Sequence, residues 1–243
     1  MKIVAIVQAR MGSSRLPQKV LKDLGGATVL DRVLRRLGRA RLVDQILVAT
    51  TLAPQDSVIV DHCGRGGACV FRGSEQDVLD RYYRAAEHLE AGVVVRITSD
   101  CPLIDPEVTD ATIQAFLEHH ADYASNVRVR TYPRGLDTEV MTVNALERAW
   151  REARQPHQRE HVTPYIYENP GEFKLHGIEN DTDCSRHRWT FDTPEDLEFL
   201  QAVYARFGGR DDFGWREILE LVETDPSLAD INRHIARKAV REG

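Results

Sequence analysis

The first residues with an evident chemical capacity follow directly after the apolar run at the start of the chain. They are three cations, one glycine and two hydroxyls: Arg10, Gly12, Ser13, Ser14, Arg15 and Lys19. Arginine binds phosphate through paired hydrogen bonds, whereas lysine supplies a point charge. Glycine lets the backbone approach a ligand closely. The segment indicates a polyphosphate cradle without the Walker A or Rossmann pattern. A solvated basic turn is an equal alternative on composition alone.

Two carboxylates add a second element of the same chemistry. Asp100 comes three residues after the apolar run 93–97, and Asp192 follows residues 189–191. Oxygen ligands of this kind suit a hard divalent cation, although turns and helix caps are the commoner use of Asp. Thr193 is placed to cap the next helix, which leaves Asp192 free. With the basic segment, the two carboxylates indicate a site for a metal-bound phosphate.

A third motif offers an alternative metal. The segment HQREH places His157, Glu160 and His161 in the HxxEH pattern of one class of zinc enzymes. That pattern needs a longer helix and a further ligand, and the sequence shows neither. We therefore expect no zinc here, and the role of the segment stays open.

The first half of the chain alternates strand and helix patterns that would position these residues. Short β-branched runs predict strands over 3–7, 45–49, 68–71 and 93–97. Amphipathic spacing and capping residues predict helices over 29–37, 55–62, 77–89 and 108–119, with Ser74 as the cap of the third and Asp105 as the cap of the fourth. This alternation indicates a mostly parallel sheet with helices on both faces.

The second half is less regular. We predict strands over 137–143, 173–176 and 189–191, and helices over 145–153, 194–207, 215–222 and 228–241. The whole chain, residues 1–243, reads as one α/β domain. A small arm around residues 125–175 is expected to cover a substrate or to form a dimer contact.

Composition limits the function classes. The chain has 243 residues and a net charge of −6, which disfavours a general nucleic-acid binder. No apolar run approaches the roughly 20 residues needed to span a bilayer, and the first residues do not resemble a signal peptide. The four cysteines form no CxxC pair, which is typical of reduced thiols. We expect a cytoplasmic protein with no membrane or nucleic-acid partner.

Four stretches together resemble the cytidylyltransferase-like family, which includes the enzymes that make CMP-3-deoxy-manno-octulosonate and CMP-sialic acids. They are VQARMGSSRLPQKVL, VRITSDCPLIDPEV, REHVTPYIYENP and RWTFDTPEDLEFL. The resemblance covers about residues 2–207 and is greatest to the branch of spore coat polysaccharide biosynthesis protein F. It implies a nucleotide-diphospho-sugar transferase-like, Rossmann-like fold and a homodimer.

The resemblance also implies a reaction, in which CTP and an acidic sugar give a CMP-sugar and pyrophosphate for surface polysaccharide. Catalysis would rest on Arg10, Lys19, Asp100 and Asp192, with Mg²⁺ on the two aspartates. The nucleotide would be held by Ala9, Arg10, Met11, Gly12, Ser13, Ser14, Arg15 and Lys19, and more weakly by Arg72 and Ser74 near the base. The segment YPRGLDTEV, with Arg134, Asp137 and Glu139, resembles the acceptor region.

Several alternatives stay open on the sequence. The base and the acceptor rest on resemblance alone, so another nucleoside triphosphate, a phosphonate or a sugar phosphate is an alternative. A glycosyltransferase acting on a nucleotide sugar shares a similar sheet, but its DxD-type pair is absent from SDCPLID. A nucleotide-binding protein without activity is a third reading, which the two carboxylates disfavour.

Overall fold

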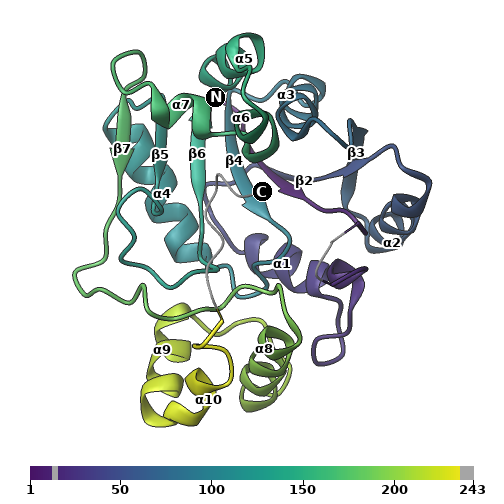
Figure 1. The fold of residues 1–243 in the computed structure, drawn as a ribbon, viewed down its shortest axis with the longest axis vertical. Coiled ribbons are helices and arrows are strands. Elements are labelled where there is room, and N and C mark those ends of the chain that lie inside the picture. Colours follow the sequence, from purple (N-terminus) through teal and green to yellow (C-terminus); the bar gives the residue numbers. More distant parts are fainter. Residues whose placement is uncertain (13–15, 236–243) are drawn as a thin grey trace.

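The structure is a computed structural model that describes residues 1–12 and 16–235. Within them a seven-stranded sheet has the order β3-β2-β1-β4-β6-β5-β7 (Figure 1). Only β6 runs against the others. This confirms the predicted, mostly parallel sheet. The strands are β1 (Ile3–Gln8), β2 (Gln45–Thr51), β3 (Cys69–Gly73), β4 (Val93–Thr98), β5 (Tyr123–Ser125), β6 (Glu139–Thr142) and β7 (Leu175–Gly177).

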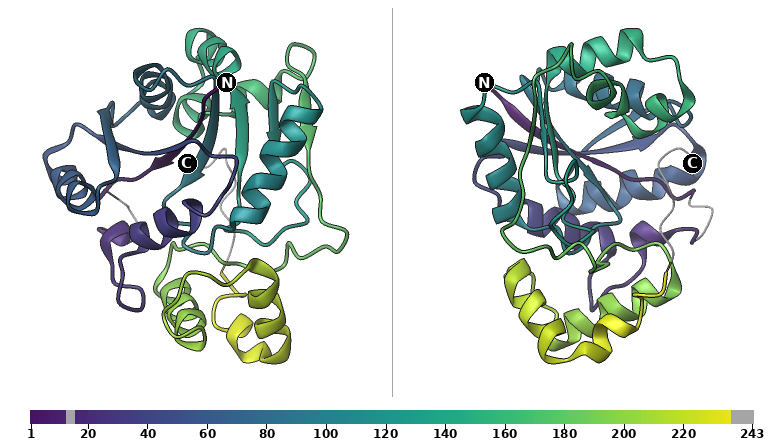
Figure 2. Two further views of the ribbon diagram at one scale, coloured as in Figure 1. Left: turned by 180° about the vertical axis from the view of Figure 1, so that it is seen from behind. Right: turned by 60° about the vertical axis from the view of Figure 1, so that its left-hand side comes forward.

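Helices cover both faces of the sheet, as the sequence predicts (Figure 2). Successive residues of a strand point to opposite faces, so β1 contributes to two cores. Val4 and Ile6 join one core, and Ala5 and Val7 join the other. The first core is covered by α3 (Val78–His88) and α5 (Val143–Glu152), and the second by α1 (Val29–Leu37), α2 (Ser57–Gly66) and α4 (Pro106–Glu118).

The remaining helices form two smaller groups. The short helices α6 (Pro156–His161) and α7 (Pro164–Glu168) lie beside α3 and α5, respectively. The C-terminal helices lie below the sheet in Figure 1. They pack with Trp189 and Phe191 into a third core. In the described ranges no helix has the length and apolar character to span a membrane. These C-terminal helices are α8 (Pro194–Arg206), α9 (Trp215–Thr224) and α10 (Pro226–Asp230).

Predicted caps fix the ends of two helices next to the site. Asp105 accepts hydrogen bonds from the N–H groups of Glu107 and Val108 at the start of α4, as expected. At the start of α8, Thr193 and Asp196 form a reciprocal capping box. Such caps satisfy backbone donors that have no partner inside the helix. They fix where the chain leaves the sheet edge and becomes helical.

Three local predictions are wrong. Asp77, and not Ser74, caps α3, because Ser74 Oγ accepts a bond from the N–H of Asp77 itself. Residues 189–191 form no strand, since their N–H groups bond to two different segments and not to one ladder: Trp189 donates to the carbonyl of Arg134, and Phe191 donates to that of Asp100. The last predicted helix, 228–241, is replaced by α10, which ends at Asp230, and residues 236–243 lie outside the described ranges.

Gly135 lets two distant segments approach closely. Its φ is +109°, and a Cβ atom there would lie 2.6 Å from the carbonyl oxygen of Trp189. The residue before it, Arg134, makes two hydrogen bonds to the same segment: its N–H donates to His187 O (3.0 Å), and its carbonyl accepts from Trp189 N (2.7 Å). This contact holds the segment that leads to Asp192.

We predict that Gly135→Ala destabilises the protein by roughly 2–4 kcal/mol, because both the positive φ and the contact with Trp189 are unfavourable for a side chain. Chemical denaturation followed by circular dichroism measures the change. Gly171→Ala is the matched control, since no heavy atom lies within 4 Å of its added Cβ. Equal stability of the two variants would contradict the role given to Gly135.

Candidate active site

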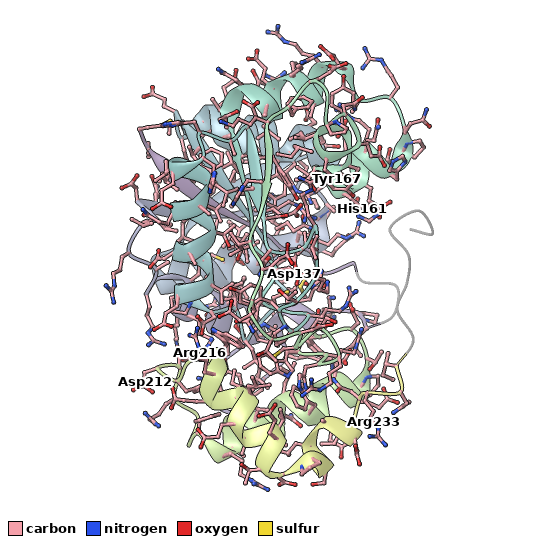
Figure 3. The ribbon with its side chains drawn as sticks, turned by 90° about the vertical axis from the view of Figure 1, so that its left-hand side faces the viewer. Asp137, His161, Tyr167, Asp212, Arg216 and Arg233 are labelled. Atoms are coloured by element: carbon pink, nitrogen blue, oxygen red, sulfur yellow. The ribbon has the colours of Figure 1, made fainter. Side chains whose placement is uncertain are left out.

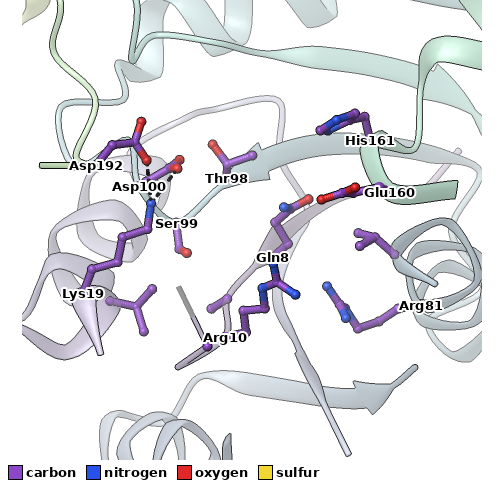
Figure 4. Close-up of a pocket in the computed structure, with 14 residues that line it drawn as sticks. Gln8, Arg10, Lys19, Arg81, Thr98, Ser99, Asp100, Glu160, His161 and Asp192 are labelled. Carbon is purple, nitrogen blue, oxygen red and sulfur yellow. Dashed lines mark hydrogen bonds and ion pairs between the residues drawn. The ribbon is translucent and has the colours of Figure 1, made fainter. Parts of the chain in front are cut away.

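A cavity of about 240 Å³ opens at the carboxyl ends of β1 and β4 (Figure 4). This edge is where ligands of parallel α/β sheets bind, because the loops that follow the strands converge there. Its lining is polar and contains cations and carboxylates together. The lining residues are Gln8, Ala9, Arg10, Gly12, Lys19, Val20, Val78, Arg81, Thr98, Ser99, Asp100, Glu160, His161 and Asp192.

The predicted phosphate loop forms one wall of this cavity. Met11 itself is buried, and its N–H donates to Asp56 Oδ1 at 2.7 Å. The N–H of Gln18 donates to the carbonyl of Met11 at 3.0 Å, which closes the loop before the 3₁₀ turn Lys19–Leu21 begins. The loop residues that line the cavity are Ala9, Arg10, Gly12 and Lys19. The predicted residues Ser13, Ser14 and Arg15 lie outside the described residues.

Lys19 brings the two predicted carboxylates together. Its ammonium donates to Asp100 Oδ2 at 3.0 Å and to Asp192 Oδ1 at 2.9 Å (Figure 4). A third hydrogen bond of 3.0 Å goes to the carbonyl of Phe191. The Lys19 side chain is only 12% exposed. Three residues that the sequence predicts separately thus form one cluster at one end of the cavity.

Backbone contacts explain why Asp192 lies beside Asp100. The N–H of Phe191 donates to the carbonyl of Asp100 at 2.8 Å. The hydroxyl of Thr190 donates to the same carbonyl at 3.1 Å. These bonds join the segment before α8 to the end of β4. The site therefore depends on a contact between loops and not on a further strand of the sheet.

Asp192 is held from its other side by Arg188. Arg188 Nη2 donates to Asp192 Oδ2 at 3.2 Å. The sequence predicts a free Asp192, but its carboxylate pairs with two cations, Lys19 and Arg188. Arg188 in turn makes a two-pronged contact of 2.8 Å with the fully buried Asp196. Asp196 Oδ2 also accepts the N–H of Asp192 at 2.9 Å. The carboxylate of Asp192 is therefore fixed independently of Lys19.

The charges of this cluster stabilise one another. Burial alone would lower the pKa of Lys19, but Asp100 and Asp192 outweigh it, so the pKa is raised. Burial would raise the pKa of Asp100, but the Lys19 ammonium outweighs it, and the pKa falls to about 2. Both groups are therefore charged at neutral pH.

Arg81 is a cavity residue that the sequence reasoning missed. It is 2% exposed, and its Nη1 donates to the carbonyl of Ser74 at 2.5 Å. Figure 4 shows its guanidinium facing that of Arg10 across the cavity. Burial, and to a smaller extent the charge of Arg10, lower the pKa of Arg81. Its helical position could have revealed it: Arg81 follows Val78 by three residues, and this spacing places both on the buried face of α3.

Arg72 and Ser74, the residues expected near the base, are not among the residues that line the cavity. Arg72 donates to the carbonyls of Thr51 (2.9 Å) and Ala53 (3.1 Å). These contacts shape the turns beside the cavity. A role of Arg72 and Ser74 in nucleotide binding stays a prediction.

A second cavity of about 520 Å³ adjoins the first, and the two share Thr98 and His161 as lining residues. Asp137 and Glu139, whose roles the sequence leaves open, belong to it. Figure 3 shows Asp137, His161 and Tyr167 along one side of the molecule. The complete lining is Arg96, Thr98, Tyr123, Val127, Arg128, Arg130, Arg134, Asp137, Glu139, His161, Thr163 and Tyr167.

The charges of this second cavity do not balance. Arg130 pairs with both oxygens of Asp137, at 2.6 and 2.8 Å. Arg96 pairs with Glu139, which also accepts a bond from the hydroxyl of Tyr123 at 2.6 Å. The lining thus holds four arginines and two carboxylates, an excess of two positive charges. Such a cavity suits an anionic ligand.

A strained turn separates the two cavity residues His161 and Thr163. Val162 is fully buried and has φ +73° and ψ −54°, which is unusual for a β-branched residue. The N–H of Thr163 donates to the carbonyl of His161 at 2.9 Å, so the three residues form a γ-turn. Strain of this kind is concentrated at functional sites. Here the turn places His161 on the wall of both cavities and Thr163 on the wall of the second.

Comparison with known proteins identifies the family. A sequence model described as cytidylyltransferase matches residues 4–212. The chain belongs to the cytidylyltransferase family. The matched range contains Lys19, Asp100 and Asp192 and all the residues that line the two cavities.

Individual relatives are similar to nearly the whole chain. The cytidylyltransferase chain is 41% identical over 244 residues to the uncharacterized protein MJ1063 of Methanocaldococcus jannaschii, covering 100% of this chain and 99% of that one. It is 36% identical to the spore coat polysaccharide biosynthesis protein SpsF of Bacillus subtilis, covering 93% and 96%. A solved cytidylyltransferase from Leptospira borgpetersenii superposes with a TM-score of 0.92 at 35% identity, covering 98% and 100%.

The cluster gives a pH-dependent stability. Because the folded pKa of Asp100 is about 2, below its ordinary 3.8, its stabilising effect is present above pH 4 and is lost as the pH falls toward 2. We predict that Lys19→Met removes this effect, which is on the order of 2 kcal/mol. The unfolding free energies of wild type and variant should therefore differ at pH 5 and converge toward pH 2.

The exposed Lys174→Met serves as the control and should give the wild-type pH curve. Urea denaturation at several pH values measures all three proteins. A wild-type advantage over Lys19→Met that stays constant between pH 5 and pH 2 would contradict the ionic origin of the contact.

Proposed function

We propose that this family member transfers the cytidylyl group of CTP to a small acidic sugar, releases pyrophosphate and serves surface polysaccharide synthesis. The observation that carries the proposal is the junction of two cavities at Thr98 and His161. One cavity holds cations and three carboxylates, two of which, Asp100 and Asp192, lie together as a site for a metal-bound triphosphate requires. The other has an excess of positive charge, as an anionic acceptor requires.

For the nucleotide, the first cavity offers cations at several points. Arg10 and Lys19 come from the loop after β1, and Arg81 comes from α3. We propose that Arg10 and Lys19 bind the triphosphate, as their resemblance to the family loop implies. Guanidinium and ammonium groups offset the negative charge that develops on departing pyrophosphate.

The donor set of the cluster fits Mg²⁺. Asp100 and Asp192 already share one cation, the Lys19 ammonium, and both present oxygen atoms. Within the residues that the structure describes, no group of three or more His, Cys, Asp and Glu side chains is arranged to hold a metal. Mg²⁺ is commonly bound by one or two carboxylates, with water and substrate phosphates as its other ligands. We propose that Asp100 and Asp192 hold it, and when bound it supplies positive charge at the α-phosphate.

For the acceptor, we propose the second cavity. The carboxylate of an acidic sugar would meet the arginine-rich wall, which includes Arg128 and Arg134. Its attacking hydroxyl would face the first cavity across the shared residues Thr98 and His161. In this arrangement the segment around residues 125–175 forms much of the acceptor wall, in line with the predicted covering role.

The chemistry then follows from positioning. An acceptor oxygen forms a bond to the α-phosphorus while the bond from that phosphorus to the pyrophosphate oxygen breaks. Holding both substrates in line converts a bimolecular reaction into an effectively intramolecular one. A screen of nucleoside triphosphates against acidic sugars, read by pyrophosphate release, tests the function. A glycosyltransferase would instead need a preformed nucleotide sugar.

We predict that Asp100→Asn and Asp192→Asn each lower turnover at least about 100-fold, because charge stabilisation at the α-phosphate is lost. Pyrophosphate release in the presence of CTP, Mg²⁺ and acceptor measures the rate. Asp61→Asn, at an exposed position of α2, should keep the wild-type rate. Near-normal turnover of both site variants, with circular dichroism unchanged, would remove the two aspartates from the mechanism.

We predict that Arg128→Gln raises the KM for the acidic acceptor by roughly fivefold to tenfold and leaves the KM for CTP unchanged. The reason is that Arg128 lines the second cavity and not the first. Arg65→Gln removes an equally exposed arginine from α2 and is the control. An increase in the KM for CTP alone would place the acceptor elsewhere.

A further inference from the structure

We propose that the Lys19 ammonium occupies the place of the divalent cation between Asp100 and Asp192, and that the two cations exchange there. In the metal-free protein the ammonium holds the carboxylate pair together. When a divalent cation enters, Lys19 leaves the pair and turns into the cavity. The inference rests on the proposed function and adds a step that the proposed function does not require.

The first argument is the count of donors. A lysine ammonium has three N–H donors and no acceptor. In Lys19 all three have partners at 2.9–3.0 Å, namely Asp100, Asp192 and the carbonyl of Phe191. No donor remains for a phosphate oxygen. Lys19 therefore binds the triphosphate only after it has left at least one of these partners.

The second argument is that one position cannot hold both cations. Lys19 contacts Asp100 Oδ2 and Asp192 Oδ1, the two carboxylate oxygens that point toward each other in Figure 4. A divalent ion bound by both aspartates would need the same oxygens. The approach of a second positive charge to the ammonium is also unfavourable in this part-buried site. Occupancy therefore alternates.

The third argument is that the Asp192 side chain and the Asp100 backbone have anchors other than Lys19. Asp192 Oδ2 is held by Arg188, which is itself anchored on Asp196. The backbone of Asp100 is fixed by the N–H of Phe191. Lys19, in contrast, has a flexible four-carbon stem, and it borders an open cavity of about 240 Å³. The carboxylates are thus the fixed part of the contact, and the ammonium is its mobile part.

The test uses the small number of lysines in the chain. In the wild-type protein without nucleotide, trace acylation with an amine reagent is followed at each lysine by mass spectrometry. We expect millimolar Mg²⁺ to speed acylation of Lys19 by roughly tenfold, because a side chain that is 12% exposed in the pair becomes accessible to the reagent once it turns into the cavity. The other lysines are internal standards with unchanged rates: Lys2, Lys22, Lys174 and Lys238.

A second measurement keeps the proposal falsifiable in a variant. Lys19→Met should bind Mn²⁺ roughly tenfold more tightly than wild type in a nucleotide-free titration, because the competing cation is gone. Lys22→Met removes a neighbouring charge outside the cluster and should bind as wild type does. Failure of Lys19→Met to fold leaves the wild-type acylation result decisive.

An acylation rate of Lys19 that does not respond to Mg²⁺, or an unchanged Mn²⁺ affinity in a folded Lys19→Met, overturns the exchange. If pyrophosphate release from CTP still requires Mg²⁺ in that case, the proposed function survives and only the exchange is wrong. If no triphosphate and acceptor give pyrophosphate while Lys19 responds to Mg²⁺, the exchange survives and the function is wrong.

Discussion

Asp100 and Asp192 lie against one ammonium group although they come from distant parts of the chain, and the rest of the site is arranged around that contact. Two carboxylates in a part-buried position repel each other unless a cation lies between them. Lys19 supplies that cation, and Arg188 neutralises Asp192 from behind. These ion pairs thus place two carboxylates at the carboxyl edge of the sheet, where we propose that they hold Mg²⁺.

The position of the cluster follows from the sheet. Parallel strands place the loops after β1 and β4 at the same edge, and there Lys19 pairs with Asp100. The antiparallel β6 then extends the sheet beside β4 and brings Glu139 opposite Arg96. That pair lines the second cavity, which shares the lining residues Thr98 and His161 with the first. One sheet edge therefore places the cavity that we propose for the triphosphate next to the cavity that we propose for the anionic acceptor.

The sequence predicts the part of the site that local patterns encode. The apolar runs mark β1 and β4; Asp100 comes two residues after the end of β4, and Lys19 belongs to the basic segment that follows β1. The approach of residues 189–191 to Asp100 has no such signal. It depends on single backbone bonds and on the close passage at Gly135, and this is why the segment is mistaken for a strand. Arg81 was missed because charged residues are rarely buried, so an arginine on the apolar face of a helix is not expected to line a cavity.

The measurement that tests the central claim most directly is the Mg²⁺ dependence of CTP binding, determined by calorimetry without an acceptor. The account predicts that Mg²⁺ strengthens CTP binding to the wild-type protein, and that the Asp100→Asn, Asp192→Asn double variant loses this increase. Tight CTP binding that is the same with Mg²⁺ and with a chelator, in both proteins, would contradict the account.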